Sequence, residues 1–211
     1  MLKILYEDNH IIVCIKDKGI LSQADNTDKI DMLTLVKAYI KEKYHKEGNV
    51  YLGLVHRLDI NTSGVMVFAR TSKAAKRLSE AISSHQFNKK YHALVEGHFD
   101  DLDTHFLTSY IYKDEKERKS YIRSDGKEAK LSYKKIEEYK IDNQIVSLLD
   151  ISLETGRFHQ IRCQMASINH PLYGDKKYGS CNPSDKYHLC AYSLTFPHPI
   201  TKEMMTFCME D

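Results

Sequence analysis

Short apolar runs separated by turn-forming residues recur along this 211-residue chain and constrain its fold more than any other feature. Residues 2–7 and 11–16 flank the turn signal Asp8-Asn9, which predicts a β-hairpin. Further strand-like runs cover residues 65–69, 89–97, 129–133, 145–151, 189–196 and 204–209. The charged stretch 113–119 is expected to be a loop. A chain of this kind is expected to be mostly sheet.

Three segments instead have apolar residues at helical spacing. The first, residues 32–40, follows a possible N-cap at Asp31, and the second follows Thr71-Ser72. The third, residues 157–168, follows the turn Thr155-Gly156. Strands that meander with only a few helices between them favour an α+β fold over a regular βαβ alternation. At this length, residues 1–211 are expected to form a single domain.

The composition excludes several classes of protein. Hydrophobic residues make up 42% and charged residues 28%, so the chain resembles neither a disordered protein nor a coiled coil. The N-terminus lacks the apolar run of a signal peptide or membrane span, which predicts a cytoplasmic protein. Five cysteines without a CxxC pair favour reduced thiols. Eleven histidines show no zinc-binding spacing, and no dinucleotide or Walker motif occurs, so we expect neither metal nor cofactor.

The overall charge of +2 does not identify a nucleic-acid binder, but basic residues gather in two stretches. One contains Lys73, Lys76, Arg77, Lys89 and Lys90. The other contains Arg157, Arg162, Lys176 and Lys177. Such runs are more often solvated faces than binding sites. Both are candidates for contacts with phosphate groups.

A polar segment, His56 to Gly64, lies between the apolar runs 51–55 and 65–69. Polar loops held by strands are common places for binding and catalytic groups. Asp, Asn, Thr and Gly are also ordinary turn formers, so residue types alone favour a simple turn.

The string HRLDINTSG, followed by VMVFA, resembles the signature of the RluA family of pseudouridine synthases, HRLDxxTSGxxxxA. Four further blocks follow in the family's order. They are the Lys89 to Gly97 block, TGRxHQIR from Thr155 to Arg162, HPxxGDxxYG from His170 to Gly179, and a closing block from Leu189 to Pro199. The resemblance implies the pseudouridine synthase fold, a mixed, mostly antiparallel sheet with flanking helices and a central RNA-binding cleft. Some family members carry a small separate N-terminal RNA-binding domain; because this chain begins directly with the catalytic fold, we expect a single catalytic domain without one.

The resemblance assigns three catalytic residues. Asp59 is implied as the carboxylate, and an Asp is ionised at neutral pH without a base to activate it. Arg157 is implied as its salt-bridge partner, and Tyr91 as the residue that stacks on the base. The sequence does not decide whether Asp59 attacks the sugar or removes a sugar proton.

Further residues are implied in RNA binding and base flipping. Arg57 matches the residue that enters the space left by the flipped nucleotide, and Leu189 matches an apolar residue of the base pocket. Flipping is required because the anomeric carbon is inaccessible in stacked RNA. The other candidates are His56, Thr62, Ser63, Arg162 and Lys89.

Two other functions stay open on sequence alone. A non-catalytic RNA-binding protein could keep the fold, but Asp59, Tyr91 and Arg157 are all present. A nucleoside or glycoside hydrolase would need a second carboxylate. Candidates for that second carboxylate are Glu80, Glu96 and Asp175. For the synthase, ribosomal and transfer RNA are both possible substrates, and a monomer is expected.

Departures from the family pattern avoid the assigned catalytic positions. Lys16-Asp17-Lys18-Gly19 stands where the family usually has Lys-Pro-x-Gly, which removes a Pro that would stiffen the turn. Asn169 replaces a Gly, and Asn tolerates the left-handed conformation next best, so a helix can still end there.

Overall fold

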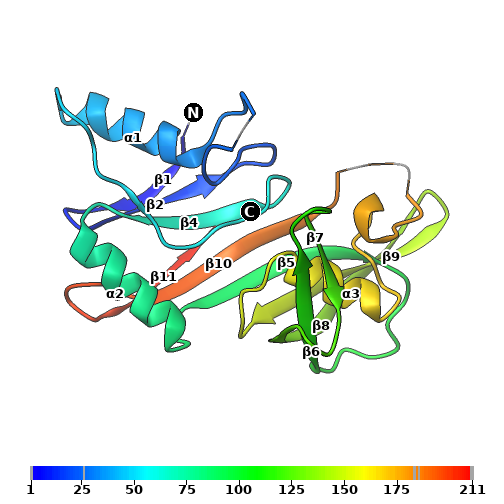
Figure 1. The fold of residues 1–211 in the computed structure, drawn as a ribbon. Helices are drawn as coiled ribbons and strands as arrows, with labels where there is room; N and C mark the ends of the chain where they lie inside the picture. The colour runs from blue at the N-terminus through cyan, green and yellow to red at the C-terminus, as the bar shows by residue number, and fades with distance from the viewer. Residues whose placement is uncertain (1, 26, 183, 185, 210–211) are drawn as a thin grey trace. The chain divides into compact units, whose positions relative to one another are not determined.

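The computed structural model describes residues 2–25, 27–182, 184 and 186–209, and its chain forms two compact units. Unit 1 comprises Met1–Asn88 and Ala191–Asp211, and unit 2 comprises Lys89–Cys190. Figure 1 shows strands and helices in both units. The strands pair antiparallel in most places, and three α-helices accompany them. The predicted α+β fold with a mostly antiparallel sheet is confirmed.

In unit 1 the strand order is β1, β2, β4, β10. The bounds are β1 Ile4–Glu7, β2 Ile11–Lys16, β3 Gly53–Leu54, β4 Ser63–Ala69, β10 Leu189–Pro197 and β11 Met204–Cys208. Of β10, the part from Ala191 onward belongs to unit 1. Strand β3 pairs with β4, and β11 pairs with β10. The predicted hairpin of β1 and β2 is confirmed. In the β2 and β4 pair, Lys16 lies opposite Gly64.

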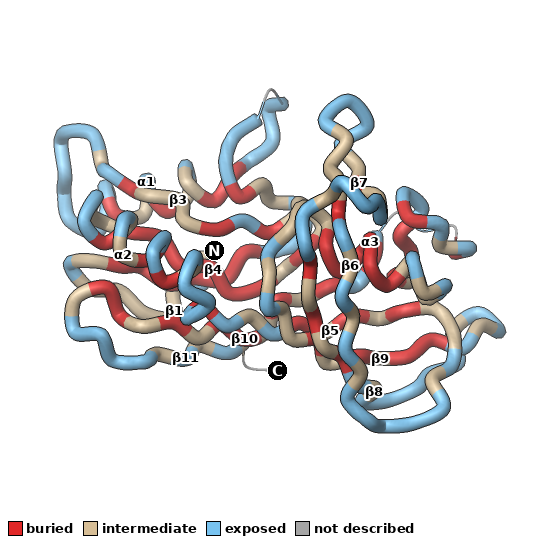
Figure 2. The backbone as a smooth tube through the Cα atoms, turned by 60° about the horizontal axis from the view of Figure 1, so that its bottom comes forward, coloured by how far each residue is buried: buried red, intermediate tan, exposed pale blue. Residues whose placement is uncertain are grey.

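The core of unit 1 forms where β2 and β4 carry nearly continuous apolar side chains. All six residues of β2 are buried, as are six of the seven in β4, and Figure 2 shows the tube at β4 largely in red. Helix α2, Ser72–Ser83, contributes Ala74 and Leu78 to this core. Burial on both faces explains why these strands are continuous apolar runs rather than alternating ones.

Both predicted helix starts in unit 1 are confirmed. Helix α1, Met32–Lys43, begins after Asp31, whose carboxylate accepts a hydrogen bond from the Thr34 N–H at 3.1 Å. Thr71 caps α2 in the same way through the Ala74 N–H, also at 3.1 Å. Among the described residues, no helix has the length and apolar character needed to cross a membrane.

In unit 2 the strand order is β5, β9, β8, β6, β7. The bounds are β5 Asn88–Glu96, β6 His105–Asp114, β7 Lys119–Ile122, β8 Lys127–Ile141 and β9 Gln144–Leu153. Helix α3, Gln160–Ser167, and the short helix η1, Lys176–Tyr178, follow. Cys163 of α3 and Tyr178 of η1 pack with Ile111 and Ala129, so α3 covers one face of β6 and β8.

Helix α3 is shorter than the predicted segment 157–168. His159 adopts a left-handed backbone conformation, with φ of 51°, so the helix begins at Gln160. Arg157 therefore precedes the helix and does not lie in its first turn. At the other end Asn169 has φ of 65°, as expected for the residue that replaces Gly.

The prediction of a loop over residues 113–119 is wrong at both of its ends. Lys113 and Asp114 end β6, and Lys119 begins β7; these two strands form an antiparallel hairpin. Asp114 closes the turn by accepting hydrogen bonds from the Lys116 and Glu117 N–H groups, both at 2.9 Å. The prediction failed because the charged residues of the turn extend into the ends of both strands. The other residues of these strands are largely aromatic and β-branched, which are types that favour strands.

A side-chain contact between His198 and Asp8 joins the two ends of unit 1. His198, which is 5% exposed, lies with Nε2 2.9 Å from the Asp8 carboxylate. The other Asp8 oxygen accepts the backbone N–H groups of His10 and Ile11 at 2.7 and 2.8 Å. Burial raises the pKa of the Asp8 carboxyl, but the hydrogen bonds from Ile11, His10 and His198 outweigh it and lower the pKa below its usual range.

Replacement of Asp8 by Asn should reduce the free energy of unfolding by about 2 kcal/mol at pH 7, because charged hydrogen-bond acceptors are worth more than neutral ones. Folding lowers the pKa of this carboxyl, so its ionised form stabilises the folded protein at every pH above the pKa of the unfolded state, near 4. This contribution is lost as the pH falls through the lower pKa of the folded state. Urea unfolding at pH 7 and at acidic pH measures the difference in free energy of unfolding between the unaltered protein and Asp8→Asn. This difference should shrink on acidification.

The matched control for this prediction is Asp125→Asn, because Asp125 makes an exposed pair with Arg123. That substitution should change stability by less than about 0.5 kcal/mol. Equal effects of the two substitutions at pH 7 would show that the Asp8 and His198 pair does not stabilise unit 1.

Candidate active site

The signature segment forms the loop between β3 and β4 of unit 1. Its residues His56, Arg57, Asp59, Thr62 and Ser63 all belong to this unit. The Asp59 side chain is half-buried and Arg57 is exposed. The loop therefore presents a carboxylate and a guanidinium two residues apart at one end of β4.

Backbone hydrogen bonds fix this loop on both sides of Asp59. The Ser22 hydroxyl accepts the Leu58 N–H at 3.0 Å and donates to the Leu58 carbonyl at 2.8 Å. The Gly19 N–H donates to the Ile60 carbonyl at 2.8 Å, and the Thr62 N–H donates to the carbonyl of Asp59 itself at 3.0 Å. Asp59 thus lies in a turn whose backbone has little freedom.

The Lys16 side chain is completely buried beneath this loop. Its ammonium donates to the carbonyls of Ile60 at 3.1 Å and Thr62 at 2.7 Å, and to that of Asp17 at 3.1 Å. Burial lowers the pKa of the Lys16 ammonium to about 8, against the raising effect of the Asp59 and Asp17 carboxylates. At neutral pH a positive charge therefore lies next to the Asp59 loop.

Two signature residues point into unit 1. The His56 side chain is 7% exposed, and its Nε2 accepts a hydrogen bond from the Val67 N–H at 3.1 Å. Its ring packs edge-on against the Phe87 ring, with 5.3 Å between the ring centres. The Thr62 side chain is 2% exposed. These positions favour structural roles for His56 and Thr62, whereas Arg57 and the half-buried Ser63 are more accessible.

Gly64 is required by a close approach of two strands in unit 1. Its φ is +141°, and a Cβ at this position would lie 2.4 Å from the Ala191 carbonyl oxygen. Only glycine permits both the conformation and the contact. The Gly of the signature therefore has a steric explanation.

The remaining candidates belong to unit 2. Tyr91 of β5 is 5% exposed and lies opposite Ile151 of β9. Lys89 lies opposite Leu153 of β9, on the same face of β5 as Tyr91. Burial lowers the pKa of the Lys89 ammonium to about 8. Leu189, at the start of β10, is 4% exposed.

The two arginines of the TGRxHQIR block have different surroundings. Arg157 is half-buried, and its Nε donates to the Glu128 carbonyl at 2.8 Å. Arg162 is 6% exposed and makes a bidentate pair with Asp175, at 2.6 and 2.9 Å. Its guanidinium also lies over the Tyr178 and Tyr187 rings. Arg162 is therefore held rigidly, and Asp175 is engaged in that pair.

The structure brings the candidates together in two groups, one in each unit. Asp59, Arg57 and their neighbours share the loop of unit 1, while Lys89, Tyr91, Arg157, Arg162 and Leu189 belong to unit 2. Contact between Asp59 and Tyr91 or Arg157 would join the two units, so it stays a prediction.

Comparison with known proteins decides the family. A model described as RNA pseudouridylate synthase matches residues 10–167. The chain is also 34% identical over 230 residues to Ribosomal large subunit pseudouridine synthase D of Zymomonas mobilis, an alignment that covers 99% of this chain and 69% of the relative. This chain belongs to the RNA pseudouridine synthase family. Its activity is that of an isomerase.

Other similarities agree with this assignment. An uncharacterized RNA pseudouridine synthase of Aquifex aeolicus is 35% identical over 227 residues, covering 100% of this chain and 69% of that protein. The solved structure of Human RNA Pseudouridylate Synthase Domain Containing 1 has a TM-score of 0.79 at 21% identity, covering 100% of this chain and 84% of that chain. The human structure supports the fold of the synthase.

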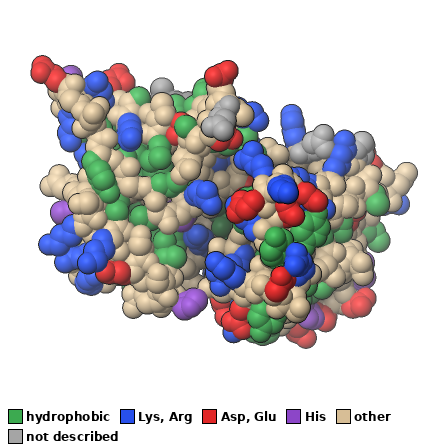
Figure 3. Space-filling view, viewed as in Figure 1, with side chains coloured by type: hydrophobic (Ala, Val, Ile, Leu, Met, Phe, Trp, Pro, Cys, Tyr) green, Lys and Arg blue, Asp and Glu red, His purple; other side chains and the backbone are tan. Residues whose placement is uncertain are grey.

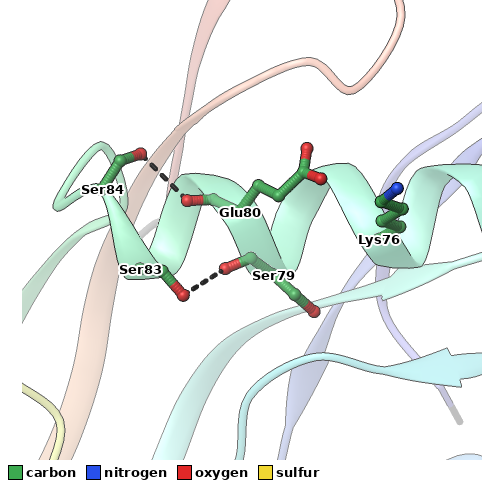
Figure 4. Close-up of a pocket in the computed structure, with 5 residues that line it drawn as sticks. All are labelled: Lys76, Ser79, Glu80, Ser83 and Ser84. Carbon is green, nitrogen blue, oxygen red and sulfur yellow. Dashed lines mark hydrogen bonds between the residues drawn. The ribbon is translucent and has the colours of Figure 1, made fainter.

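A surface depression on α2 lies apart from the signature loop. It is lined by Lys76, Ser79, Glu80, Ser83 and Ser84. Figure 4 shows hydrogen bonds from two serine hydroxyls to carbonyls of the preceding helical turn. Ser83 donates to the Ser79 carbonyl at 3.0 Å, and Ser84 donates to the Glu80 carbonyl at 2.9 Å. These bonds satisfy the helix itself, and no chemistry of the synthase is assigned there. Among the described residues, no group of three His, Cys, Asp or Glu side chains could hold a metal ion.

Lys16 is a candidate positioning residue that sequence reasoning missed. A lysine at the end of a strand is usually exposed, so nothing in residue type marks it. The usable signal was its place in the stretch resembling Lys-Pro-x-Gly. Its contacts identify it as a residue that positions the Asp59 loop.

Replacement of Lys16 by Met should remove the ammonium donor from the Thr62 carbonyl and leave the Ile60 carbonyl with the Gly19 N–H alone. We expect the free energy of unfolding to fall by about 3 kcal/mol and the rate at saturating RNA to fall at least about tenfold. Urea unfolding and single-turnover pseudouridine formation measure the two effects. The control is Lys18→Met, since Lys18 is exposed. A Lys16→Met enzyme as stable and as fast as this control would contradict the role given to Lys16.

Proposed function

We propose that this synthase converts uridines of large-subunit ribosomal RNA to pseudouridine, with Asp59 as the reacting carboxylate. The observation that carries the assignment of Asp59 is the anchored loop, in which Lys16, Ser22 and Gly19 hold the backbone around a half-buried carboxylate. A group held in this way can meet a reacting centre with little loss of entropy.

The reaction breaks the bond between uracil N1 and the anomeric carbon and forms a new bond from that carbon to uracil C5. The proton lost from C5 is matched by the one gained at N1, so no atom is gained or lost. An ionised Asp59 can begin the reaction either by attack on the sugar or by removal of a sugar proton. Neither route needs a second carboxylate or a water molecule, in contrast to glycoside hydrolysis.

The other candidate residues hold the base. In this proposal Tyr91 stacks on the detached uracil, and Leu189 provides an apolar wall. Arg57 enters the space that the flipped nucleotide leaves in the base stack. This insertion offsets the free-energy cost of unstacking that nucleotide, which is a few kcal/mol. The exposure of Arg57 agrees with its proposed role.

The choice of ribosomal over transfer RNA rests on the relatives. Several that are at least 30% identical carry the name Ribosomal large subunit pseudouridine synthase D, including those of Zymomonas mobilis and Nitrosomonas europaea. We infer that this synthase acts on the same class of RNA, in the cytoplasm where ribosomes are assembled, and as a monomer.

Replacement of Asp59 by Asn should abolish pseudouridine formation, a loss of at least about 1,000-fold, because the variant lacks the reacting carboxylate. Stability and RNA affinity should change little, since the side chain keeps its volume. Nucleoside analysis of treated ribosomal RNA measures activity, and filter binding measures affinity.

Asp28→Asn serves as the control for charge, because Asp28 is exposed and outside the signature. It should keep full activity. Substantial pseudouridine formation by purified Asp59→Asn protein would refute the role of Asp59.

Arg157 and Arg162 can be compared as partners of Asp59. If Arg157 pairs with Asp59, then Arg157→Ala should lower the rate at saturating RNA by about 100-fold or more, since the carboxylate loses its orienting charge. Arg162→Ala should instead lower the free energy of unfolding by roughly 3 to 5 kcal/mol, because it leaves Asp175 buried and uncompensated. An active Arg157→Ala enzyme would exclude Arg157 and direct attention to the buried Arg162.

A further inference from the structure

Buried polar side chains distinguish helix α3 of unit 2 more clearly than surface charge does. Basic and acidic side chains are interspersed over much of the face drawn in Figure 3. Helix α3 instead buries two glutamines one turn apart, Gln160 and Gln164, and both are almost fully buried. A buried carboxamide is costly unless it forms hydrogen bonds. The partners of each glutamine therefore indicate what it does.

Gln160 binds the segment that precedes the helix. Its Oε1 accepts hydrogen bonds from the Arg157 N–H and from the Thr155 hydroxyl, both at 2.9 Å. The backbone N–H of Gln160 donates in return to the Arg157 carbonyl at 3.2 Å. Residues 155–160 therefore form a closed turn, which we call the Arg157 turn, and Gln160 meets Arg157 through two bonds.

The Arg157 turn is fastened to β8. Gln160 Nε2 donates to the Lys130 carbonyl at 3.0 Å, and the Lys130 N–H donates to the Thr155 hydroxyl oxygen at 2.8 Å. Arg157 Nε donates to the carbonyl of Glu128, on the same strand, at 2.8 Å. Both the backbone and the guanidinium of Arg157 are thus held against β8.

The backbone at Arg157 needs a side-chain acceptor because α3 does not extend back to it. The left-handed His159 is the N-cap, so the Arg157 N–H lies two residues before it and outside the helix. A backbone N–H that is withdrawn from water needs a partner. In a capping box, a Glu or Gln side chain of the first helical turn accepts the N–H of the N-cap residue. Gln160 does the equivalent for Arg157.

Gln164 offers a matched contrast on the same helix. Its Nε2 donates to the Ser109 hydroxyl at 2.9 Å and to the Ala129 carbonyl at 3.2 Å. These partners belong to β6 and β8 and not to the Arg157 turn. The two glutamines therefore share residue type, helix and burial, and they differ in whether they hold Arg157.

We propose that Gln160 is a positioning residue of the synthase, which holds Arg157 in the orientation that the reaction uses. The inference rests on the proposed function, in which Arg157 pairs with Asp59. Gln160 acts through Arg157, because its carboxamide is buried and already bonded to the Arg157 turn. A displacement of about 1 Å in a group that orients the reacting centre can lower a rate about 100-fold. Loss of Gln160 should therefore slow the reaction and leave RNA affinity unchanged.

The test compares Gln160→Met with Gln164→Met, because Met fills nearly the same volume and cannot form these bonds. Each variant should lower the melting temperature by about 5 °C, since each loses buried hydrogen bonds. The rate at saturating RNA should fall at least about tenfold in Gln160→Met and less than about twofold in Gln164→Met. The RNA concentration that gives half the maximal rate should change less than about twofold in both.

A double variant tests whether Gln160 acts through Arg157. Gln160→Met combined with Arg157→Ala should be less than about twofold slower than Arg157→Ala alone, because the positioned group is already absent. Rate losses that multiply would overturn the inference. Equal rates of the two Met variants, with an inactive Arg157→Ala enzyme, would overturn the inference alone. A fully active Arg157→Ala enzyme would refute the proposed pairing with Asp59, and the role of Gln160 with it.

Two further choices keep the outcomes distinct. If Gln160→Met is unfolded at the assay temperature, Thr155→Val replaces it and Ser109→Ala is its control, since these hydroxyls are the partners of Gln160 and Gln164. The rate should again fall in the first variant alone. The probe is total RNA from cells that lack this gene, which contains both ribosomal and transfer RNA. Pseudouridine formed in transfer RNA alone would refute the ribosomal substrate and leave the test of Gln160 intact.

Discussion

The buried ammonium of Lys16 is the interaction on which the rest of the active-site loop depends. Desolvation of a cation is costly, and it is tolerated here because three carbonyl groups surround the charge. Two of those carbonyls belong to Ile60 and Thr62, on either side of the central turn of the signature. The same contact that keeps Lys16 charged therefore fixes the backbone that carries Asp59. Stability and positioning cannot be separated at this residue.

The chemistry needs such a loop because the enzyme must hold an ionised carboxylate without admitting water to the reaction. Ser22 and Gly19 add hydrogen bonds from a second segment, and Gly64 lets β4 approach Ala191 closely. Unit 2 contributes a different kind of support. There the pair of Arg162 and Asp175 anchors α3 to the segment before η1. Unit 1 thus fixes the carboxylate that we propose reacts with the RNA.

Much of the fold could be predicted because its strands are apolar runs and its helices begin at Asp31 and Thr71. The hairpin of β6 and β7 was missed because charged residues dominate its turn, although the run from His105 to Tyr112 has strand-like composition. The start of α3 could not be predicted, since a left-handed His159 depends on contacts with Tyr178 and Phe158. The positions of Lys16 and His198 depend on partners far away in the sequence. The family signature singles out Asp59 as a candidate, but only the contacts reveal what holds its loop.

The central claim is that the enzyme isomerises uridine and does not hydrolyse it, and product analysis tests this most directly. Purified protein is incubated with an unmodified transcript of large-subunit ribosomal RNA, the RNA is digested to nucleosides, and uridine, pseudouridine and free uracil are quantified. Retention of the detached base predicts that pseudouridine appears in the amount by which uridine decreases, with RNA mass unchanged and no uracil in solution. Free uracil and abasic sites without pseudouridine would contradict the account.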